Sequence, residues 1–334
     1  MKITSRYFGT TGAGETVTEY TLSDGGVSVS VLNYGGIITK IVVPDRDGKP
    51  TDIVLGYASL ADYEKNPAYF GACIGRVAGR QRDAQVTVNG KVYALSRNDN
   101  TNHLHGTFPH KVFSASVSVD SLWLRTVSPA EEEGYPGDLT FSVRYSLDGK
   151  GTLTVAYDAE CTEDTPVNFT NHSYFNLSGH GSGRVVEQTL QICADEFLEN
   201  DDELCPTGER LPVADTPFDF RRMAPIGQGF PVRGEQMEFS DGYDHCFLLR
   251  EGAEFAAVAH SEKTGITLEV VTTEPGLIFY SGNYLGDGGP VGKDGVPYDA
   301  QDGFCLETES VPPAVLQAGR HFRSTTLYKF STQA

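Results

Sequence analysis

The sequence predicts an all-β protein, a large antiparallel β-sandwich with few short helices. Apolar and polar residues alternate in many segments of strand length, as where Val27, Val29 and Val31 stand between serines. The 334 residues include 37 glycines and 17 prolines, which is typical of a protein with many turns. Long amphipathic helical patterns are absent, so a doubly wound α/β sheet is excluded and a sandwich or barrel remains.

Three pairs of segments are predicted to form hairpins because short turn sequences connect them. The strongest signal is Asn89-Gly90, a dipeptide that favours the two-residue hairpin turn. Asp148-Gly149-Lys150-Gly151 separates a second pair, and a turn ending at Gly265 separates a third. The pairs are residues 86–88 with 92–95, 139–147 with 153–159, and 255–260 with 266–273.

One short helix is predicted over residues 59–66, with Ser59 as the N-cap and Asp62 in the first turn. No repeat with a period of 20 to 50 residues and no linker interrupts the chain. We therefore expect residues 1–334 to form a single domain.

The composition excludes several classes of protein. The formal net charge of −19 disfavours nucleic-acid binding, because that binding relies on Lys and Arg side chains that neutralise phosphates. A neutral small-molecule substrate fits this charge better than an anionic one. No stretch approaches the roughly 20 apolar residues of a membrane span.

The cysteines and the first residues predict a cytoplasmic location. Six cysteines lie far apart without C-x-x-C spacing, which indicates buried thiols in a reducing compartment. Residues 1–7 lack the apolar core of a signal peptide.

His172 is the first candidate catalytic residue. It stands in the strand-like segment 167–177, where regular alternation would place Asn168, Thr170 and His172 on one face. A histidine titrates near neutral pH and can therefore donate or accept a proton. The alternative interpretation is a buried structural histidine bonded to a backbone carbonyl.

Glu307 is the second candidate, because it follows apolar residues in a strand-like segment and carboxylates are rarely buried without a partner. A glutamate and a histidine together can supply a base and an acid. In the alternative interpretation Glu307 and Glu309 form a solvated stripe on an edge strand, since they share one strand face.

His103 and His105 share a strand face, a spacing that metal sites also use. No third ligand of suitable spacing is nearby, so we expect no metal site. His103 is interpreted as structural, and the loop that begins at Gly106 is expected to present His105 to a pocket.

Two arginines and one aspartate are candidate binding residues. Arg76 and Arg80 lie four residues apart among small residues, which permits a guanidinium to point into a cleft. Asp244 is able to accept hydrogen bonds from hydroxyl groups. The alternatives are surface arginines and an aspartate that caps a turn.

Together these motifs resemble the aldose 1-epimerase (galactose mutarotase) family, and the likeness covers nearly the whole chain. It rests on residues 33–36, 75–80, 102–106, 171–177, 206–209, 216–220, 242–245, 275–276, 279–283 and 306–308.

The resemblance implies an isomerase that needs no cofactor and interconverts the α and β anomers of a free aldohexose of the glucose or galactose type. It implies that His172 is the general acid for the ring oxygen and that Glu307 is the general base for the C1 hydroxyl. It also implies sugar contacts from Arg80, His105, Asp244, Ser173 and Tyr174.

For acid and base catalysis we expect nearby carboxylates to keep His172 protonated and donors such as Arg80 to keep Glu307 ionised. Three positions depart from the family pattern, namely Gly79, Ile278 and Glu309, where amide side chains are usual. Lost amides change which hydroxyls are recognised, so the preferred aldose stays open.

Two other functions remain at this point. A β-sandwich glycoside hydrolase would use two carboxylates such as Asp244 and Glu307. A non-catalytic sugar-binding protein would use aromatic platforms such as Trp123. We expect a monomer or a homodimer.

Overall fold

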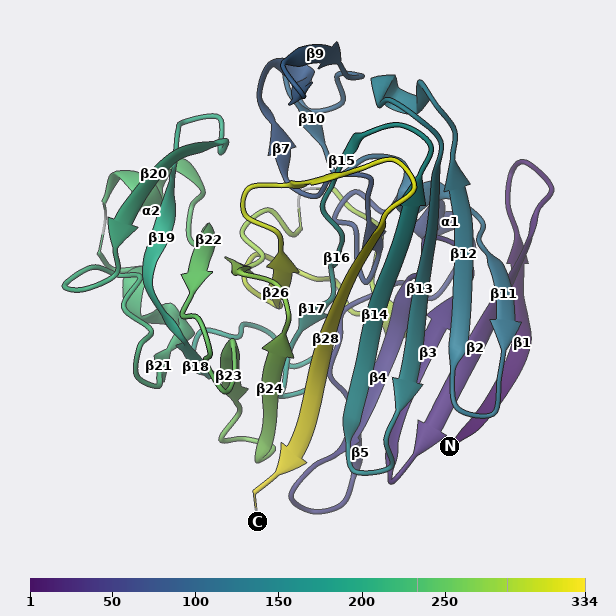
Figure 1. The fold of residues 1–334 in the computed structure, drawn as a ribbon. Helices are drawn as coiled ribbons and strands as arrows, with labels where there is room; N and C mark the ends of the chain where they lie inside the picture. Colours follow the sequence, from purple (N-terminus) through teal and green to yellow (C-terminus); the bar gives the residue numbers. More distant parts are fainter. Residues whose placement is uncertain (233, 287, 334) are drawn as a thin grey trace.

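The computed structural model describes residues 1–232, 234–286 and 288–333 and consists mainly of antiparallel strands (Figure 1). Its three larger sheets have five, nine and six strands. The α helices of the described ranges are α1 (Leu60–Lys65) and α2 (Glu235–Phe239). The predicted fold class, an all-β protein with few short helices, is confirmed.

The first sheet contains the N-terminal strands in sequence order. Val27, Val29 and Val31 are all buried, as their alternation predicts for strands with one face on the core. The strands are β1 (Lys2–Thr10), β2 (Thr16–Asp24), β3 (Val27–Leu32), β4 (Ile38–Pro44) and β5 (Pro50–Asp52).

The last strand of the chain, β28, lies in the middle of the nine-stranded sheet. It pairs with β14 on one side and with β24 on the other. Apolar side chains of this sheet and of the five-stranded sheet form one continuous core. The strand order is β11 (Ser114–Val117), β12 (Leu122–Ser128), β13 (Leu139–Leu147), β14 (Thr152–Cys161), β28 (His321–Thr332), β24 (Ile266–Thr272), β23 (Ala257–His260), β18 (Thr189–Ile192) and β21 (Ala224–Pro225).

The six-stranded sheet has two unlike faces. Phe304 and Leu306 of β26 belong to the large core, whereas Cys305 between them belongs to a second apolar cluster. In Figure 1 its green strands β19, β20 and β22 lie on the side of the molecule away from β1. The order is β17 (Tyr174–Phe175), β26 (Phe304–Glu309), β25 (Gly276–Tyr280), β22 (Asp244–Leu249), β19 (Ala194–Asn200) and β20 (Pro206–Pro212).

Short strand pairs complete the fold. They are β8 (Gln85–Val88) with β9 (Lys91–Ala94), β7 (Arg80–Gln81) with β10 (His103–Leu104), β6 (Cys73–Ile74) with β16 (Thr170–Asn171), and β15 (Thr165–Val167) with β27 (Ala314–Leu316).

The predicted turns and the predicted helix are confirmed. Asn89 and Gly90 have φ values of 50° and 80° between β8 and β9, the left-handed geometry that this hairpin turn requires. The other two hairpins are β13 with β14 and β23 with β24. Ser59 accepts a hydrogen bond from the backbone N–H of Asp62 at the start of α1. None of the described helices has the length and apolar character needed to cross a bilayer.

Candidate active site

A cavity of about 960 Å³ lies over one face of the six-stranded sheet. This volume is in the range of small-molecule sites. Alternate residues of adjacent strands line it, because side chains of a strand point to opposite faces. These residues are Leu198 and Asn200 of β19, Asp244, Cys246 and Leu248 of β22, Ile278 and Tyr280 of β25, and Glu307 and Glu309 of β26.

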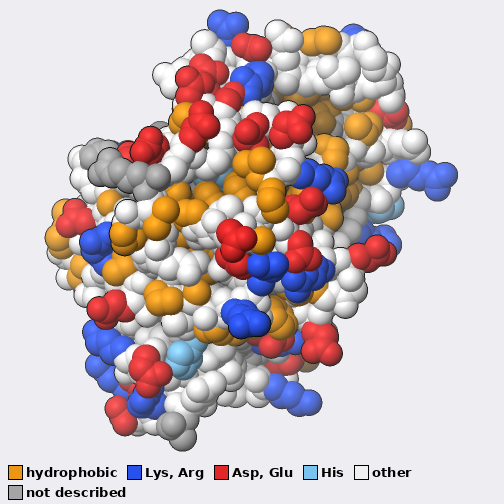
Figure 2. Space-filling view, turned by 90° about the vertical axis from the view of Figure 1, so that its left-hand side faces the viewer, with side chains coloured by type: hydrophobic (Ala, Val, Ile, Leu, Met, Phe, Trp, Pro, Cys, Tyr) orange, Lys and Arg blue, Asp and Glu red, His pale blue; other side chains and the backbone are white. Residues whose placement is uncertain are grey.

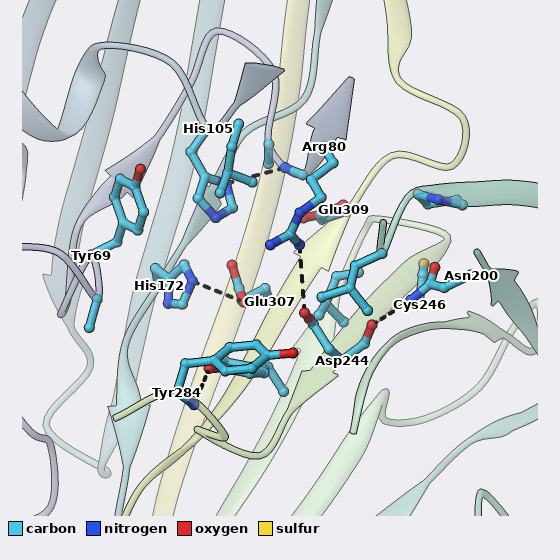
Figure 3. A pocket seen from close by; sticks show the side chains of 18 of the residues that line it. Tyr69, Arg80, His105, His172, Asn200, Asp244, Cys246, Tyr284, Glu307 and Glu309 are labelled. Carbon is cyan, nitrogen blue, oxygen red and sulfur yellow. Dashed lines mark hydrogen bonds and ion pairs between the residues drawn. The ribbon is translucent and has the colours of Figure 1, made fainter. Parts of the chain in front are cut away.

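The other walls come from segments distant in the sequence. Arg80 of β7 and His105, which follows β10, enter from one side, and Tyr69 enters from the segment between α1 and β6 (Figure 3). On the face of the molecule shown in Figure 2, acidic side chains stand among hydrophobic patches, in keeping with the net charge of −19.

His172 and Glu307 face each other in this cavity (Figure 3). The Nε2 atom of His172 lies 3.6 Å from Oε1 of Glu307, and the two side chains are 6% and 4% exposed. The pairing of Tyr174 with Cys305 between β17 and β26 fixes the two segments in this register. Because β26 is an interior strand, the alternative of a solvated stripe on an edge strand is wrong.

The strand around His172 is interrupted rather than regular. It is divided among β15, β16 and β17, with His172 between the last two. Asn168 and His172 line the cavity, but Thr170 does not. The predicted common face of these three residues is therefore only partly correct, because the breaks interrupt the alternation.

Aromatic rings and a thiol hold the imidazole of His172 in place. The rings of Tyr174 and Tyr69 stack on it with centroid distances of 5.1 and 6.1 Å. The Sγ atom of Cys305 lies 3.5 Å from its Nδ1 atom. The ring therefore directs Nε2 toward Glu307 and Nδ1 toward the thiol, so its orientation is well defined.

The protonation states differ from those expected from the sequence. Burial lowers the pKa of His172 to about 4 and raises the pKa of Glu307 well above its usual value. The expected support from Arg80 is missing because its guanidinium pairs with Asp99 and Asp244. The expectation that the surroundings keep His172 charged and Glu307 ionised is thus wrong, because desolvation outweighs the neighbouring charges.

Arg80 and Asp244 form a charged pair in the cavity (Figure 3). Nη1 of Arg80 lies 3.7 Å from Oδ2 of Asp244, and Nε donates to Oδ2 of Asp99 at 2.8 Å. Burial lowers the pKa of Arg80, but these carboxylates outweigh burial and raise it. Burial raises the pKa of Asp244 while Arg80 opposes the rise. The pair thus offers guanidinium donors and carboxylate acceptors to a polyol.

His105 has a left-handed backbone, with φ of 63°, and its Nδ1 accepts a hydrogen bond from the N–H of Gly79 at 3.2 Å. Burial, with the nearby His172 and Arg80, holds its pKa well below the usual value, so the ring is neutral. His103 does not line the cavity. Its Nδ1 lies 2.8 Å from the carbonyl oxygen of Ser96, in agreement with the structural role predicted for it.

Three sequence candidates lie elsewhere. The Ser173 hydroxyl is buried and donates to Asn171 rather than lining the cavity. The guanidinium of Arg76 is buried and donates to backbone oxygens, including that of Pro136, so the expectation that it points into the cleft is wrong. Trp123 lies on β12, outside the cavity lining, beneath the guanidinium of Arg144.

Several residues that line the cavity were not found from the sequence. Tyr69 has φ of 56° in an irregular segment, and no periodic signal marks such a residue. Tyr280 carried a signal, since it alternates with Ile278 and Gly276 along β25. Asn200 donates to the backbone oxygen of Asp244 at 2.8 Å, a contact between strands that no local pattern shows.

Among the described residues, His172, Cys305 and Glu307 form a close group of metal-ligating type. The thiol faces Nδ1 and the carboxylate faces Nε2 of the same imidazole. One ring nitrogen of His172, Sγ of Cys305 and a carboxylate oxygen of Glu307 all lie within 4.8 Å of one another. The 3.6 Å approach of Nε2 to Oε1 also suits a proton transfer between the imidazole and the carboxylate.

Comparison with known proteins identifies the family of this chain. A family model described as aldose 1-epimerase matches residues 18–329. The chain belongs to the aldose 1-epimerase family. It is 41% identical to a galactose mutarotase from Sus scrofa, over 99% of each chain. It is 34% identical to an aldose 1-epimerase from Escherichia coli K12, over 92% of this chain and 93% of the relative.

Solved structures of this aldose 1-epimerase family have the same fold. A galactose 1-epimerase from Lactobacillus acidophilus superposes with a TM-score of 0.87 at 30% identity, covering 100% of this chain and 99% of that one. An aldose epimerase homologue from C. elegans superposes with a TM-score of 0.85 at 28% identity, covering 93% and 97%. The predicted family, fold and isomerase class are confirmed.

Proposed function

We propose that this protein interconverts the α and β anomers of a free aldohexose, with His172 as general acid and Glu307 as general base. The observation that carries the proposal is the 3.6 Å approach of their buried side chains within a cavity of suitable size. Family membership over residues 18–329 supports the reaction type.

The reaction requires one proton to be given and one to be taken. Glu307 takes the proton of the C1 hydroxyl while His172 gives a proton to the ring oxygen, so the bond between C1 and that oxygen breaks and the free aldehyde forms. Rotation about the bond between C1 and C2 exposes the other carbonyl face. Ring closure with the two roles reversed then yields the opposite anomer.

Burial raises the pKa of Glu307 and lowers the pKa of His172, and both directions favour a resting state with the shared proton on Glu307. Transfer of that proton to Nε2 of His172 then produces the arrangement that opens the ring. Both arrangements contain the same number of protons. The pKa values obtained from a pH profile therefore belong to the pair of His172 and Glu307 rather than to either group alone.

Arg80, His105, Asp244 and Tyr174 surround the reacting pair and are our proposed sugar contacts. Ser173 is left out because its hydroxyl donates to Asn171 instead. A neutral sugar suits the cavity, since several carboxyl groups face it and Arg80 already pairs with one of them, Asp244, and with Asp99 outside the lining. Ile278 of β25, which departs from the family pattern, lies opposite Glu307 of β26. We therefore expect it to influence which aldose is preferred.

Polarimetry of freshly dissolved α-glucose and α-galactose tests the proposal. We expect the wild type to accelerate equilibration of at least one sugar, and Glu307→Gln to lose about 10²-fold or more, the contribution of one general base. Glu254→Gln, the same change at an exposed position, is the matched control and should keep wild-type activity. A wild type without acceleration, or a fully active Glu307→Gln, would refute the proposal.

A glycoside substrate and a sugar-binding measurement, added to this experiment, separate the two other functions. A glycoside hydrolase that used Asp244 and Glu307 would release reducing sugar from a glycoside, and we expect none. A binding protein would retain the sugar without changing the rate of optical rotation. The position of Trp123 outside the cavity lining removes the sequence feature that favoured this second alternative.

We further propose a cytoplasmic location, because all six cysteines are free thiols, as is usual in a reducing compartment. Cell fractionation with an antibody would test it. We also propose that residues 1–334 act as one domain, since Tyr69 and Glu307 line the same cavity. We predict that the protein is a monomer or a homodimer, and light scattering would measure its molecular mass in solution.

A further inference from the structure

Glu309 is a second buried carboxylate in the cavity, and the proposed reaction does not use it. It lies on β26 two residues after Glu307 and points into the same cavity (Figure 3). Like Glu307, it is almost fully buried. A carboxyl group in such a position needs a partner or a function, because burial of an unpaired charge is costly.

The partners of Glu309 are few among the described residues. Its Oε2 atom accepts one hydrogen bond, from Nδ2 of Asn168 at 3.1 Å, and no cation lies within ion-pair distance. Asn168 in turn accepts from the backbone N–H of Ser310, so the amide orientation is fixed. Within the described part of the chain, the carboxyl group is therefore held in place without a cation beside it.

The charged groups around Glu309 are mostly acidic. Glu307 lies on the same strand, Asp244 and the thiol of Cys246 lie on β22, and Glu274 precedes β25. The nearby arginine of the cavity, Arg80 of β7, pairs with Asp99 and Asp244. Burial raises the pKa of Glu309 to about 8, the amide of Asn168 opposes this, and Asp244 and Glu274 add to it.

The spacing of Glu307 and Glu309 makes their charges interact. Residues two apart on one strand face are about 7 Å apart. At that separation in a partly buried site, the charge on one carboxylate raises the pKa of the other by about 1 to 2 units. After burial itself, Glu309 is the strongest influence that raises the pKa of Glu307.

We propose that Glu309 sets the pH range in which Glu307 acts as base: an ionised Glu309 makes Glu307 hold its proton more strongly and so opposes its action as base. This inference rests on the proposed function of Glu307. Glu309 is thus a positioning residue that acts through Glu307 rather than on the sugar. It makes the activity sensitive to pH in the range where the two carboxyl groups compete for one proton.

The test is the pH profile of kcat/KM, measured by polarimetry for the wild type and Glu309→Gln. Glutamine keeps the shape and can still accept the hydrogen bond from Asn168, but it carries no charge. We expect the acid limb of the profile to move to lower pH by about 1 unit, with about a tenfold gain below the wild-type midpoint. The plateau should stay within threefold.

Two further variants make the test decisive. Glu309→Met is also neutral and of similar size, so it should show the same shift and serves if the glutamine variant folds poorly. Glu274→Gln removes another buried carboxyl group, one that does not itself line the cavity and that accepts a hydrogen bond from the Ser310 hydroxyl. It should move the limb by less than about 0.3 unit.

The outcomes separate this inference from the proposed function. An unmoved acid limb in both neutral variants would overturn the inference, provided that the wild type is active and Glu307→Gln is not. A large rise of KM with an unmoved limb would also overturn it, because Glu309 would then contact the sugar directly. An active Glu307→Gln would instead overturn the assignment of the base.

Discussion

Replacing Arg80 with methionine tests the charged pair that we assign to sugar binding. Nη1 of Arg80 lies 3.7 Å from Oδ2 of Asp244, and the two side chains are 19% and 20% exposed. Removing the guanidinium takes away donors to the sugar. It also leaves Asp244, whose pKa burial already raises, without the charge that keeps it ionised.

The size of the effect follows from this geometry. The attraction between Arg80 and Asp244, 3.7 Å apart, is present in the free enzyme and cancels in kcat/KM, so the loss comes from the contact of the guanidinium with the sugar. A hydrogen bond from a charged donor contributes about 1.5 to 3 kcal/mol. That free energy corresponds to a loss of about 10- to 150-fold in kcat/KM.

Polarimetric assays of Arg80→Met, Arg80→Lys and the wild type measure this loss. Lysine keeps the charge but not the planar fork, so we expect it to recover only part of the activity. Arg320→Met, at an exposed position, is the matched control. If Arg80→Met keeps kcat/KM within threefold of the wild type, the pair does not contribute to catalysis as we infer.

Two further changes test other parts of the structure. Lys293→Met removes the buried ammonium that donates to Asp52 at 2.6 Å, so urea denaturation should show the free energy of unfolding reduced by about 3 to 5 kcal/mol. Adding Asp52→Asn should recover much of this stability. A reduction below about 1 kcal/mol would contradict the importance of the buried pair. Ile278→Gln adds an amide opposite Glu307 in the cavity, and polarimetry should show a change of about tenfold in the ratio of galactose to glucose activity. An unchanged ratio would mean that this position does not read a sugar hydroxyl.

Local patterns predicted the secondary structure well because they depend on neighbouring residues. Asn89-Gly90 adopts the positive φ values of its hairpin, and Ser59 caps α1. The candidate pair of His172 and Glu307 was also recognisable, since each is a titratable residue in an apolar strand-like segment. Their 3.6 Å approach depends on the pairing of β17 with β26, which no local pattern contains.

Other features of the site depend on burial and chain path. Ser173 is adjacent to His172, yet its hydroxyl turns toward Asn171, because the strand is interrupted between β16 and β17. Arg76 and Arg80 look alike in the sequence, but only Arg80 lines the cavity. Tyr69, which stacks on His172, lies in an irregular segment without a periodic signal.

The sequence by itself determined the all-β class, the hairpins, the family and the identity of the acid and base candidates. These follow from alternation, turn chemistry and motif order along the chain. The tertiary structure alone decided that burial raises the pKa of Glu307, that Arg80 is engaged by Asp99 and Asp244, and that Glu309 faces the same cavity. Ionisation depends on desolvation and on charges from distant segments, and these quantities exist only once the sheets have assembled.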